Sequence, residues 1–383
     1  MNRFDVLVVG GGIAGVSVGY ELAADRTVCL LEMEASLTFH TTGRSAATFL
    51  ESYGGPIIRR LTVSSRAFFE EPPIGFDGPL MKSRPLLWLG PIGAGAAVRA
   101  LEAEVKPLVP SVRLMEPDEA VEINPILRRE YLELCMLEPG AMELDVSALH
   151  QGYVRGLRER GGVINTLSGV VALSSIDGMW RAGTTSGDEY DAPVVINASG
   201  AWGDDVAALA GVAPVGLHPL RRTLFMVSAP GGMQVEHLPL TGDIGGTFYI
   251  KPEGNAQYLC SPADETPSPP CDAKVDELDI AGAIERIREA TILEARHVRS
   301  AWAGLRTFTA DRSPIACYEP GHDGFFWLVG QGGYGIQTAP ALARVAAALV
   351  KNDVLPADVA THGLEANHMH RDRLGGRTEL TSH

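Results

Sequence analysis

Short, nearly continuous apolar runs recur along this chain, and helical patterns follow several of them. The first run, residues 4–9 (FDVLVV), leads through glycines into a helical pattern that includes Val16 and Leu22. A second run, residues 27–31, ends at Glu32. Runs of this length between turn signals are typical of strands buried on both faces of a parallel sheet. The chain therefore opens with strand, helix and strand, the order of an α/β fold.

The turn between this first strand and helix has the glycine spacing of a dinucleotide-binding fingerprint. Gly10 suits the tight turn, Gly12 lets the backbone approach a pyrophosphate, and Gly15 lets the helix pack against the strand. The helix start also offers N–H groups and its positive dipole end to phosphates. Glu32 ends the second strand, where an acid accepts hydrogen bonds from a ribose. We therefore predict an adenine dinucleotide site.

The same signals place the other elements. Strands are expected near residues 84–89, 163–173, 180–184, 192–196, 224–227, 247–251, 257–260 and 325–329, and helices over residues 96–109, 118–123, 147–160, 280–295 and 338–350. We predict an α/β protein whose second domain is α+β. A discontinuous Rossmann-like domain (residues 1–80, 140–215 and 300–365) would carry an inserted, mixed β-sheet substrate domain (residues 81–139 and 216–299). The polar tail, residues 366–383, is expected to fray.

Two later glycine-rich stretches follow predicted strands. Residues 194–202 (VVINASGAW) end in small residues that allow close approach to the backbone, although an ordinary strand exit is the alternative. Residues 325–338 (FFWLVGQGGYGIQT) hold four glycines, which are costly unless the backbone adopts unusual angles or touches a ligand. The helix that follows would stabilise negative charge on a cofactor at its N-terminus. A plain glycine-rich turn is the alternative for this stretch.

A set of basic and phenolic residues forms a candidate anion site: Tyr53, Arg221, Arg222, Tyr249 and Arg306. Arginines near buried stretches are costly unless they pair with an anion. A guanidinium fork suits a substrate carboxylate. The alternative for each arginine alone is a surface pair with one of the 47 acidic residues.

Bulk properties narrow the function classes. A chain of 383 residues is longer than one typical core, so two domains are expected. The net charge of −15 argues against a nucleic-acid partner and against binding to an anionic membrane. Five scattered cysteines predict neither disulfides nor a metal site. With no leader pattern and no apolar run long enough to span a bilayer, we expect a cytoplasmic protein without a transmembrane segment.

Seven separated blocks resemble the D-amino-acid oxidase superfamily of FAD-dependent oxidoreductases, most closely its bacterial D-arginine dehydrogenase branch. These blocks are GGGIAGVSVGYEL, HTTGRSAA, SSRAFFEEPPIGF, LHQGYVRGLRERGG, NASGAW, AGLRTFTADRSPIA and GFFWLVGQGGYGIQT. The resemblance covers essentially the whole chain and implies non-covalent FAD. A histidine in a setting like that of His40 is bonded to the flavin in the sarcosine dehydrogenase branch. The D-arginine branch keeps this histidine with free FAD, so we expect no covalent bond.

The resemblance also implies roles for individual residues. It places Glu32 at the adenosine ribose, and Arg44 and Ser45 along the pyrophosphate and ribityl chain. The residues expected at the cofactor are Gly10, Gly12, Ile13, Ala14, Gly15, Glu32, Arg44, Ser45, Ala46, Gly200, Trp202, Gly333, Tyr334, Gly335, Ile336 and Gln337. At the substrate, Arg222 and Arg306 would bind the carboxylate, with Tyr53 and Tyr249 beside them. The Gly332 carbonyl would accept from the amine.

The chain departs from the D-arginine branch at two positions. That branch has a glutamate after an Arg-Pro pair, whereas here Leu86 follows Arg84 and Pro85. Thr48 stands where the branch has a histidine near the flavin, which leaves any role of that histidine open. The side-chain pocket is expected from Leu50, Leu86, Leu240, Gly242 and Thr48. A cationic substrate tail would meet no counter-charge there, so an uncharged or hydrophobic side chain fits better.

The resemblance therefore implies a D-amino-acid dehydrogenase or oxidase. It would convert a D-amino acid to an imino acid, which water hydrolyses to a 2-oxo acid and ammonia. The alternatives are a secondary-amine oxidase or dehydrogenase (for sarcosine, N-methyl amino acids or proline-like substrates), a non-catalytic flavin-binding subunit of an amine dehydrogenase complex, and an NAD-linked dehydrogenase. The sequence leaves open whether O2 or a quinone accepts the electrons.

Overall fold

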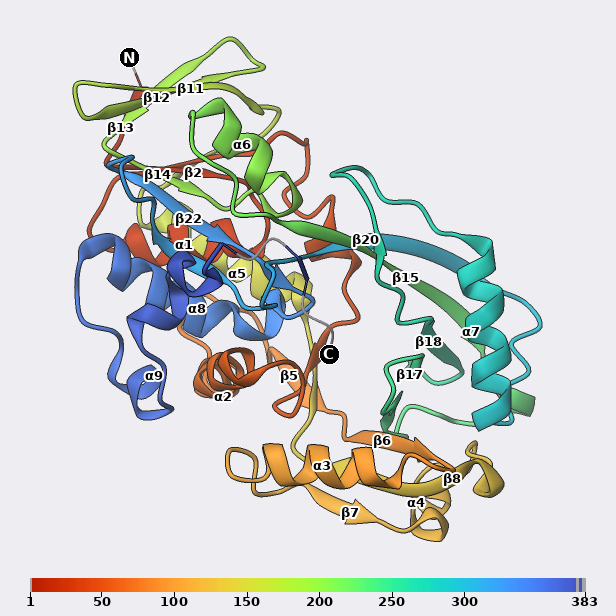
Figure 1. Cartoon of the computed structure of the whole chain (residues 1–383). Coiled ribbons are helices and arrows are strands. Elements are labelled where there is room, and N and C mark those ends of the chain that lie inside the picture. The colour runs from red at the N-terminus through yellow and green to blue at the C-terminus, as the bar shows by residue number, and fades with distance from the viewer. Residues whose placement is uncertain (1, 377–378, 381–383) are drawn as a thin grey trace.

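A six-stranded sheet carries the N-terminal glycine turn at the carboxyl ends of its strands. The computed structural model describes residues 2–376 and 379–380. In order across the sheet the strands are β10 (Val163–Asn165), β3 (Val28–Leu31), β2 (Val6–Val9), β14 (Val194–Asn197), β22 (Phe325–Val329) and β21 (Ile315–Tyr318). All neighbours pair in parallel except β21 with β22. The sheet thus gathers strands from distant parts of the chain, as Figure 1 shows.

Both faces of this sheet are covered, which explains its continuous apolar strands. Val8 and Leu30 pack toward three helices: α1 (Ile13–Leu22), α5 (Val146–Glu159) and α8 (Gly335–Lys351). Leu7 and Leu31 pack on the other face, toward a four-stranded sheet of β1 (Asn2–Arg3), β13 (Glu189–Ala192), β12 (Met179–Thr184) and β11 (Val170–Ile176). Two shorter helices, α6 (Gly203–Leu209) and α9 (Ala357–Thr361), lie at the edges of this part.

A ten-stranded sheet forms the other part of the molecule (Figure 1). Its order is β23 (Gln331–Gly332), β20 (Ser300–Phe308), β15 (His218–Ser228), β18 (Gln257–Ser261), β17 (Tyr249–Glu253), β16 (Leu240–Asp243), β6 (Leu86–Pro91), β8 (Leu132–Glu138) and β7 (Arg113–Met115), with β19 (Thr266–Pro267) beside β15. The helices around it are α3 (Gly95–Val105), α4 (Pro117–Ile123) and α7 (Glu277–Ala290). A small sheet of β4 (Thr48–Phe49), β9 (Met142–Leu144) and β5 (Met81–Ser83), together with α2 (Pro56–Glu70), connects the two parts.

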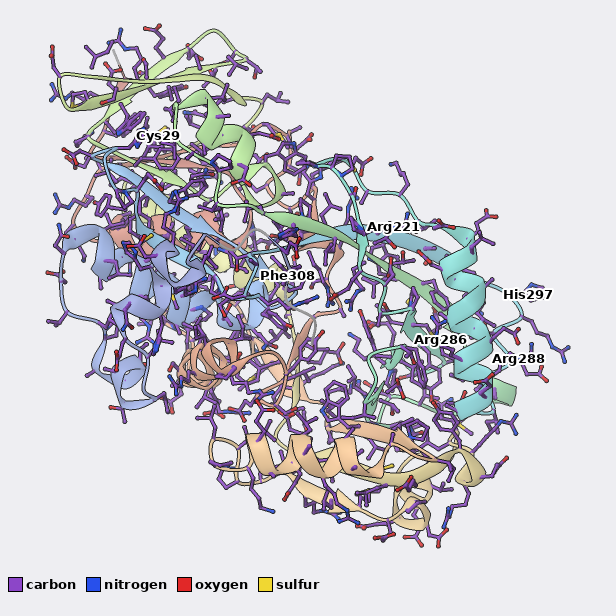
Figure 2. The ribbon with its side chains drawn as sticks, in the orientation of Figure 1. Cys29, Arg221, Arg286, Arg288, His297 and Phe308 are labelled. Carbon is purple, nitrogen blue, oxygen red and sulfur yellow. The ribbon has the colours of Figure 1, made fainter. Side chains whose placement is uncertain are left out.

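Alternate residues of β15 face opposite sides of this large sheet. Phe225 packs with α7, whereas Leu224 packs with residues on the side of the N-terminal part. Because side chains alternate along a strand, Arg222 shares the side of Leu224 and Arg221 shares the side of Phe225. Figure 2 shows Arg221 near α7, and Phe308 near the centre of the molecule. The pleat therefore separates two adjacent arginines, of which the resemblance placed only Arg222 at the substrate.

Several predicted boundaries shift for visible reasons. The helix expected over residues 280–295 begins at Glu277, because the Asp276 side chain accepts a hydrogen bond from the Leu278 N–H, and it ends at Ala290. The tail expected to fray is instead packed over residues 366–376. It forms short 3-10 helices whose Met369 and Leu374 are buried. Its remaining part includes residues 377–378 and 381–383, which lie outside the described residues.

The domain boundaries stay a prediction. All five cysteines are unpaired thiols. Among the described residues, the helices are all too short or too polar to cross a membrane.

Candidate active site

A cavity of about 320 Å³ runs from the carboxyl ends of β2, β3 and β14 to β15 and β20 of the large sheet. Ligands of α/β sheets bind at this edge. The predicted site residues that line it are Gly10, Gly12, Ile13, Ala14, Glu32, Arg44, Ser45, Ala46, Thr48, Tyr53, Gly200, Trp202, Arg222, Arg306, Gly332, Gly333, Gly335, Ile336 and Gln337. Those that lie outside its lining are Gly15, Leu50, Leu86, Leu240, Gly242, Tyr249 and Tyr334.

The glycine turn at the start of α1 is packed too closely for side chains. Gly10 has a φ of +106°, and a Cβ atom there would lie 2.6 Å from the carbonyl oxygen of Ala198. A Cβ atom on Gly15 would lie 1.8 Å from the Gly10 carbonyl oxygen. Gly12, the N-cap of α1, makes no side-chain capping hydrogen bond. Gly12 therefore places no side chain between the start of α1 and the cavity, which suits a diphosphate.

Three side chains fix the shape of this turn. Glu32 accepts hydrogen bonds from the Gly11 N–H at 2.7 Å and the Glu34 N–H at 2.9 Å. Thr42 Oγ1 accepts from the Ile13 N–H at 3.0 Å, and His150 Nε2 lies 3.0 Å from the Gly11 carbonyl oxygen. Burial lowers the pKa of His150, partly offset by this contact, so the neutral ring donates to the carbonyl. Sequence reasoning missed Thr42 and His150, because only the fold brings them to the turn.

The second glycine-rich stretch brings another helix start to the cavity. Gly332 has a φ of +56°, and a Cβ atom there would lie 2.2 Å from the ring of Phe308. The N-cap of α8, Tyr334, makes no side-chain capping hydrogen bond, while Gly335 and Ile336 line the cavity. The cavity is thus bounded by two helix N-termini whose N-cap residues, Gly12 and Tyr334, make no side-chain capping hydrogen bond. This arrangement fits a flavin dinucleotide, with the diphosphate at α1 and the anionic side of the reduced ring at α8.

Several predicted cofactor residues already bind the protein itself. The guanidinium of Arg44 contacts Asp272 at 2.6 Å and the Ala303 carbonyl at 2.9 Å, so these donors are not directed at a diphosphate. His40 Nε2 lies 3.0 Å from Glu34 Oε1. The Gln337 amide spans α8 and the backbone of Leu50. These residues shape the wall of the cavity, and the absence of a bond between His40 and flavin stays a prediction.

Arg306 and Tyr53 line the end of the cavity formed by the large sheet, and Tyr249 lies near Arg306 outside this lining. Arg306 Nη1 lies 3.3 Å from the Tyr53 hydroxyl, and Tyr249 has a buried hydroxyl without a hydrogen-bond partner among the described residues. Burial would lower the pKa of Arg306, but the phenols of Tyr53 and Tyr249 raise it above its ordinary value. Burial would raise the pKa of Tyr53, but Arg306 and Arg222 lower it. This group of donors is suited to an anion.

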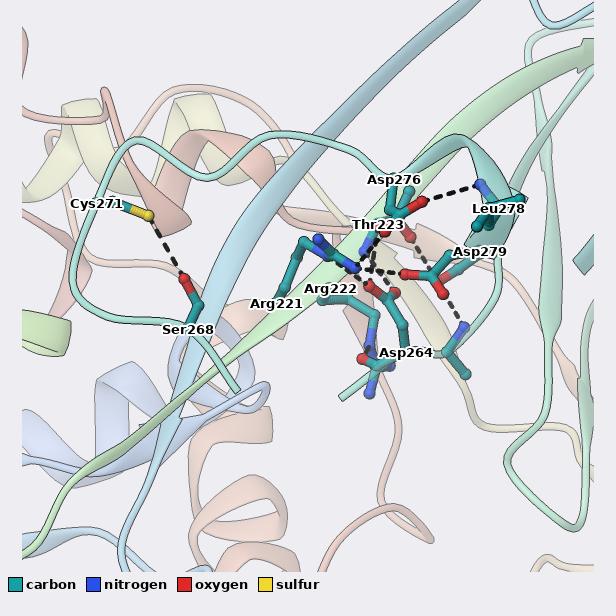
Figure 3. Close-up of polar contacts among 11 residues, drawn as sticks. Arg221, Arg222, Thr223, Asp264, Ser268, Cys271, Asp276, Leu278 and Asp279 are labelled. Carbon is teal, nitrogen blue, oxygen red and sulfur yellow. Dashed lines mark hydrogen bonds and ion pairs between the residues drawn. The ribbon is translucent and has the colours of Figure 1, made fainter. Parts of the chain in front are cut away.

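Arg222 is held in place by the loop between β18 and α7 (Figure 3). Its Nε donates to the Asp264 carbonyl at 2.7 Å, and its Nη2 lies 3.2 Å from Glu265 Oε1. Arg221, from the other face of the strand, instead binds Asp279 at 2.6 Å. Arg221 therefore pairs with an acidic residue, the alternative given above for each arginine, while Arg222 lines the cavity. The sequence held no signal for Glu265, which lies in a loop.

The predicted side-chain pocket is filled by its own residues. Leu50, Leu86 and Leu240 pack together with Ala141 and against Trp88. A Cβ atom on Gly242 would lie 3.1 Å from the Trp88 ring. Trp88, which the sequence did not single out, thus occupies the space beside these residues. Thr48 alone of the predicted pocket residues lines the cavity.

Known proteins resemble this chain over most of its length. Glycine oxidase from Geobacillus kaustophilus is 26% identical over 380 residues, which are 95% of this chain and 97% of that protein. Its crystal structure matches all of both chains with a TM-score of 0.80 at 22% identity, which confirms the predicted fold class. Human mitochondrial dimethylglycine dehydrogenase is 24% identical over 269 residues, 66% of this chain and 30% of that protein. Iminodiacetate oxidase from Chelativorans sp. BNC1 matches 92% of this chain and 96% of its own with a TM-score of 0.76 at 19% identity.

A family model described as FAD dependent oxidoreductase (DAO) matches residues 5–349. That span includes the glycine turn, Arg222, Arg306 and the second glycine-rich stretch. The predicted superfamily is confirmed, while the D-arginine dehydrogenase branch within it stays a prediction. The chain therefore belongs to the FAD dependent oxidoreductase family, and its cofactor is FAD.

Proposed function

We propose that this flavoenzyme oxidises the carbon–nitrogen bond of a small α-amino acid, a D-amino acid with an uncharged side chain. The observation that carries the proposal is Arg306. Among the described residues no carboxylate lies within ion-pair distance of its guanidinium, and its hydrogen-bond partner is the Tyr53 hydroxyl. A half-buried cation without an anion beside it is costly. A substrate carboxylate would supply that anion.

The remaining polar groups suit one bound amino acid. Arg222 lines the same cavity, and the unpartnered Tyr249 hydroxyl offers a further donor. With the carboxylate held at this end, the Gly332 carbonyl would accept from the substrate amine and orient the Cα–N bond. FAD, when bound, would accept the Cα hydrogen with its two electrons, while the amine nitrogen loses a proton and the Cα–N bond becomes a C=N bond. The protein side chains then act by positioning and electrostatics, and water hydrolyses the released imino acid to a 2-oxo acid and ammonia.

The packed leucine cluster narrows the substrate side chain. Since Leu50, Leu86 and Leu240 pack against Trp88 instead of lining the cavity, little room is left for a bulky group. The same observation favours a second candidate, an N-substituted glycine, which places its bulk on nitrogen. The names of three relatives refer to glycine, dimethylglycine and iminodiacetate, which supports this alternative equally.

An anaerobic substrate panel read by flavin absorbance tests the proposal. The panel contains glycine, D-alanine, D-leucine, D-arginine, L-alanine, sarcosine and L-proline. We expect D-alanine to bleach the flavin rapidly. Faster bleaching by sarcosine would favour the second candidate, an N-substituted glycine. Fastest bleaching by D-arginine would show that the pocket is misread. Failure of every amino acid to bleach a fully loaded yellow protein would contradict the proposed function and favour a non-catalytic flavin subunit.

A further inference from the structure

A fully buried carboxyl group, that of Glu138, lies behind the turn that carries Tyr53. Glu138 ends β8, faces Leu86 of β6 in register, and is 0% exposed. Its Oε1 accepts from the Glu51 N–H at 2.7 Å, and its Oε2 accepts from the Ser52 N–H at 3.3 Å and from the Ser52 hydroxyl. One carboxylate thus binds both peptide N–H groups that immediately precede Tyr53.

The turn is also held on its other sides. Trp88 Nε1 donates to Ser52 Oγ at 3.2 Å, and Arg59 Nε donates to the Ser52 carbonyl at 3.1 Å. Tyr53 extends from this turn to the cavity, where its hydroxyl lies 3.3 Å from Arg306 Nη1. The rigid ring of Tyr53 transmits any displacement of the turn to that hydroxyl. The backbone of Glu51 and Ser52 and the side chain of Tyr53 therefore connect the Glu138 carboxylate to the proposed substrate site.

Charged groups near Glu138 do not neutralise it. No lysine, arginine or histidine pairs with Glu138 among the described residues. Glu51, the nearest acid, is bound by Arg66 at 2.7 Å, and Arg59 pairs with Glu104 at 2.7 Å. Burial raises the pKa of Glu138 to about 7, although the hydrogen bonds from Ser52 and Glu51 oppose this rise. Its charge therefore changes near neutral pH.

We propose that Glu138 is a positioning residue whose ionised form holds the Tyr53 hydroxyl beside Arg306. An ionised carboxylate only accepts hydrogen bonds, so it satisfies the N–H groups of both Glu51 and Ser52. A proton on Oε2 makes that oxygen a donor to the Ser52 hydroxyl and a weaker acceptor for the Ser52 N–H group, whose hydrogen bond is already long at 3.3 Å. The turn shifts to recover that hydrogen bond, and Tyr53 moves with it. The site then binds a carboxylate better above neutral pH than below it.

This inference rests on the proposed function, and acetate binding to the FAD-loaded enzyme tests it. Acetate stays ionised from about pH 5.5 to about pH 8, so its own titration does not interfere. Its dissociation constant is measured from the change in flavin absorbance. We expect binding to weaken at least about fivefold as the pH falls through about 7, since a lost hydrogen bond is worth about 1 kcal/mol or more.

Three variants identify the titrating group. Glu138→Gln is expected to bind acetate weakly at every pH, without a midpoint. Ser52→Ala, which removes one donor to the carboxylate, is expected to move the midpoint to higher pH and serves if Glu138→Gln does not fold. Glu133→Gln is the matched control on β8, because the exposed Glu133 also binds a backbone N–H group and lies away from the turn. It should leave the midpoint unchanged.

The outcomes separate this inference from the proposed function. Acetate binding without a midpoint in the natural protein, or a midpoint that persists in Glu138→Gln, overturns the role of Glu138 alone. A midpoint that stays in place in Ser52→Ala also overturns it. The absence of acetate binding at any pH overturns the proposed carboxylate site and the inference together.

Discussion

Replacing Arg306 with methionine is expected to weaken substrate binding without weakening the fold. Methionine keeps much of the side-chain volume and removes the charge. Loss of a buried charge-assisted pair with a carboxylate costs about 2–5 kcal/mol. This corresponds to a fall in kcat/KM of about 30-fold to several thousand-fold. In the substrate-free protein the Arg306 guanidinium contacts the Tyr53 hydroxyl. Among the described residues it pairs with no carboxylate. The free energy of unfolding should therefore stay unchanged or rise by about 1 kcal/mol.

The assay pairs steady-state kinetics on the best substrate of the panel with urea unfolding of the loaded protein. Arg181→Met is the matched control, because Arg181 binds Asp191 through two contacts of 2.8 Å and lies outside the cavity lining. It should lose a little stability and keep its kcat/KM, the reverse of Arg306→Met. The reasoning is refuted if Arg306→Met keeps kcat/KM within about threefold of the natural protein, or loses more than about 2 kcal/mol of stability.

Three further results are expected. Gly15→Ala should fail to retain FAD on gel filtration, because its Cβ atom would lie 1.8 Å from the Gly10 carbonyl oxygen. The control Gly183→Ala should retain FAD, because its Cβ atom would lie 3.6 Å from its nearest neighbour. Trp88→Ala should open the leucine cluster and raise kcat/KM for D-leucine relative to D-alanine about tenfold or more; an unchanged ratio would place the pocket elsewhere. The pKa of Glu138 is higher in the folded protein, about 7, than its ordinary 4.5, so its contribution to stability is full below 4.5 and is lost as the pH rises through 7. Urea unfolding should show this fall, at most about 3 kcal/mol, and Glu138→Gln should abolish it.

The cofactor side of the site follows closely from local sequence. The apolar run of β2, the turn through Gly10 and the acid at Glu32 are separated by a few residues or by one helix. Strand burial, glycine conformation and the exposed helix start are all properties of adjacent residues. Chemistry that depends on neighbours along the chain is readable before the fold is known. The two glycine-rich turns therefore appear at the cavity, as expected.

The substrate side depends on the pleat of one strand and on packing between segments. Arg221 and Arg222 are adjacent in sequence. The resemblance placed Arg222 at the substrate, and the pleat of β15 gives the physical reason why Arg222 and not Arg221 meets the cavity. Leu50, Leu86 and Leu240 were predicted to form a side-chain pocket from the family resemblance. Whether three apolar side chains enclose a space or fill it depends on their mutual distances, which the sequence does not contain.

By itself, the sequence determined the strand–turn–helix start and the dinucleotide site, because these rest on local periodicity and on glycines that no other residue can replace. Its resemblance to known sequence blocks indicated the flavoenzyme family. The tertiary structure alone decided that Arg306 lies without a carboxylate partner among the described residues, that Glu138 sits buried behind Tyr53, and that Trp88 fills the neighbouring space. These are relations between strands far apart in the chain. Burial and charge balance arise only once those strands pack together.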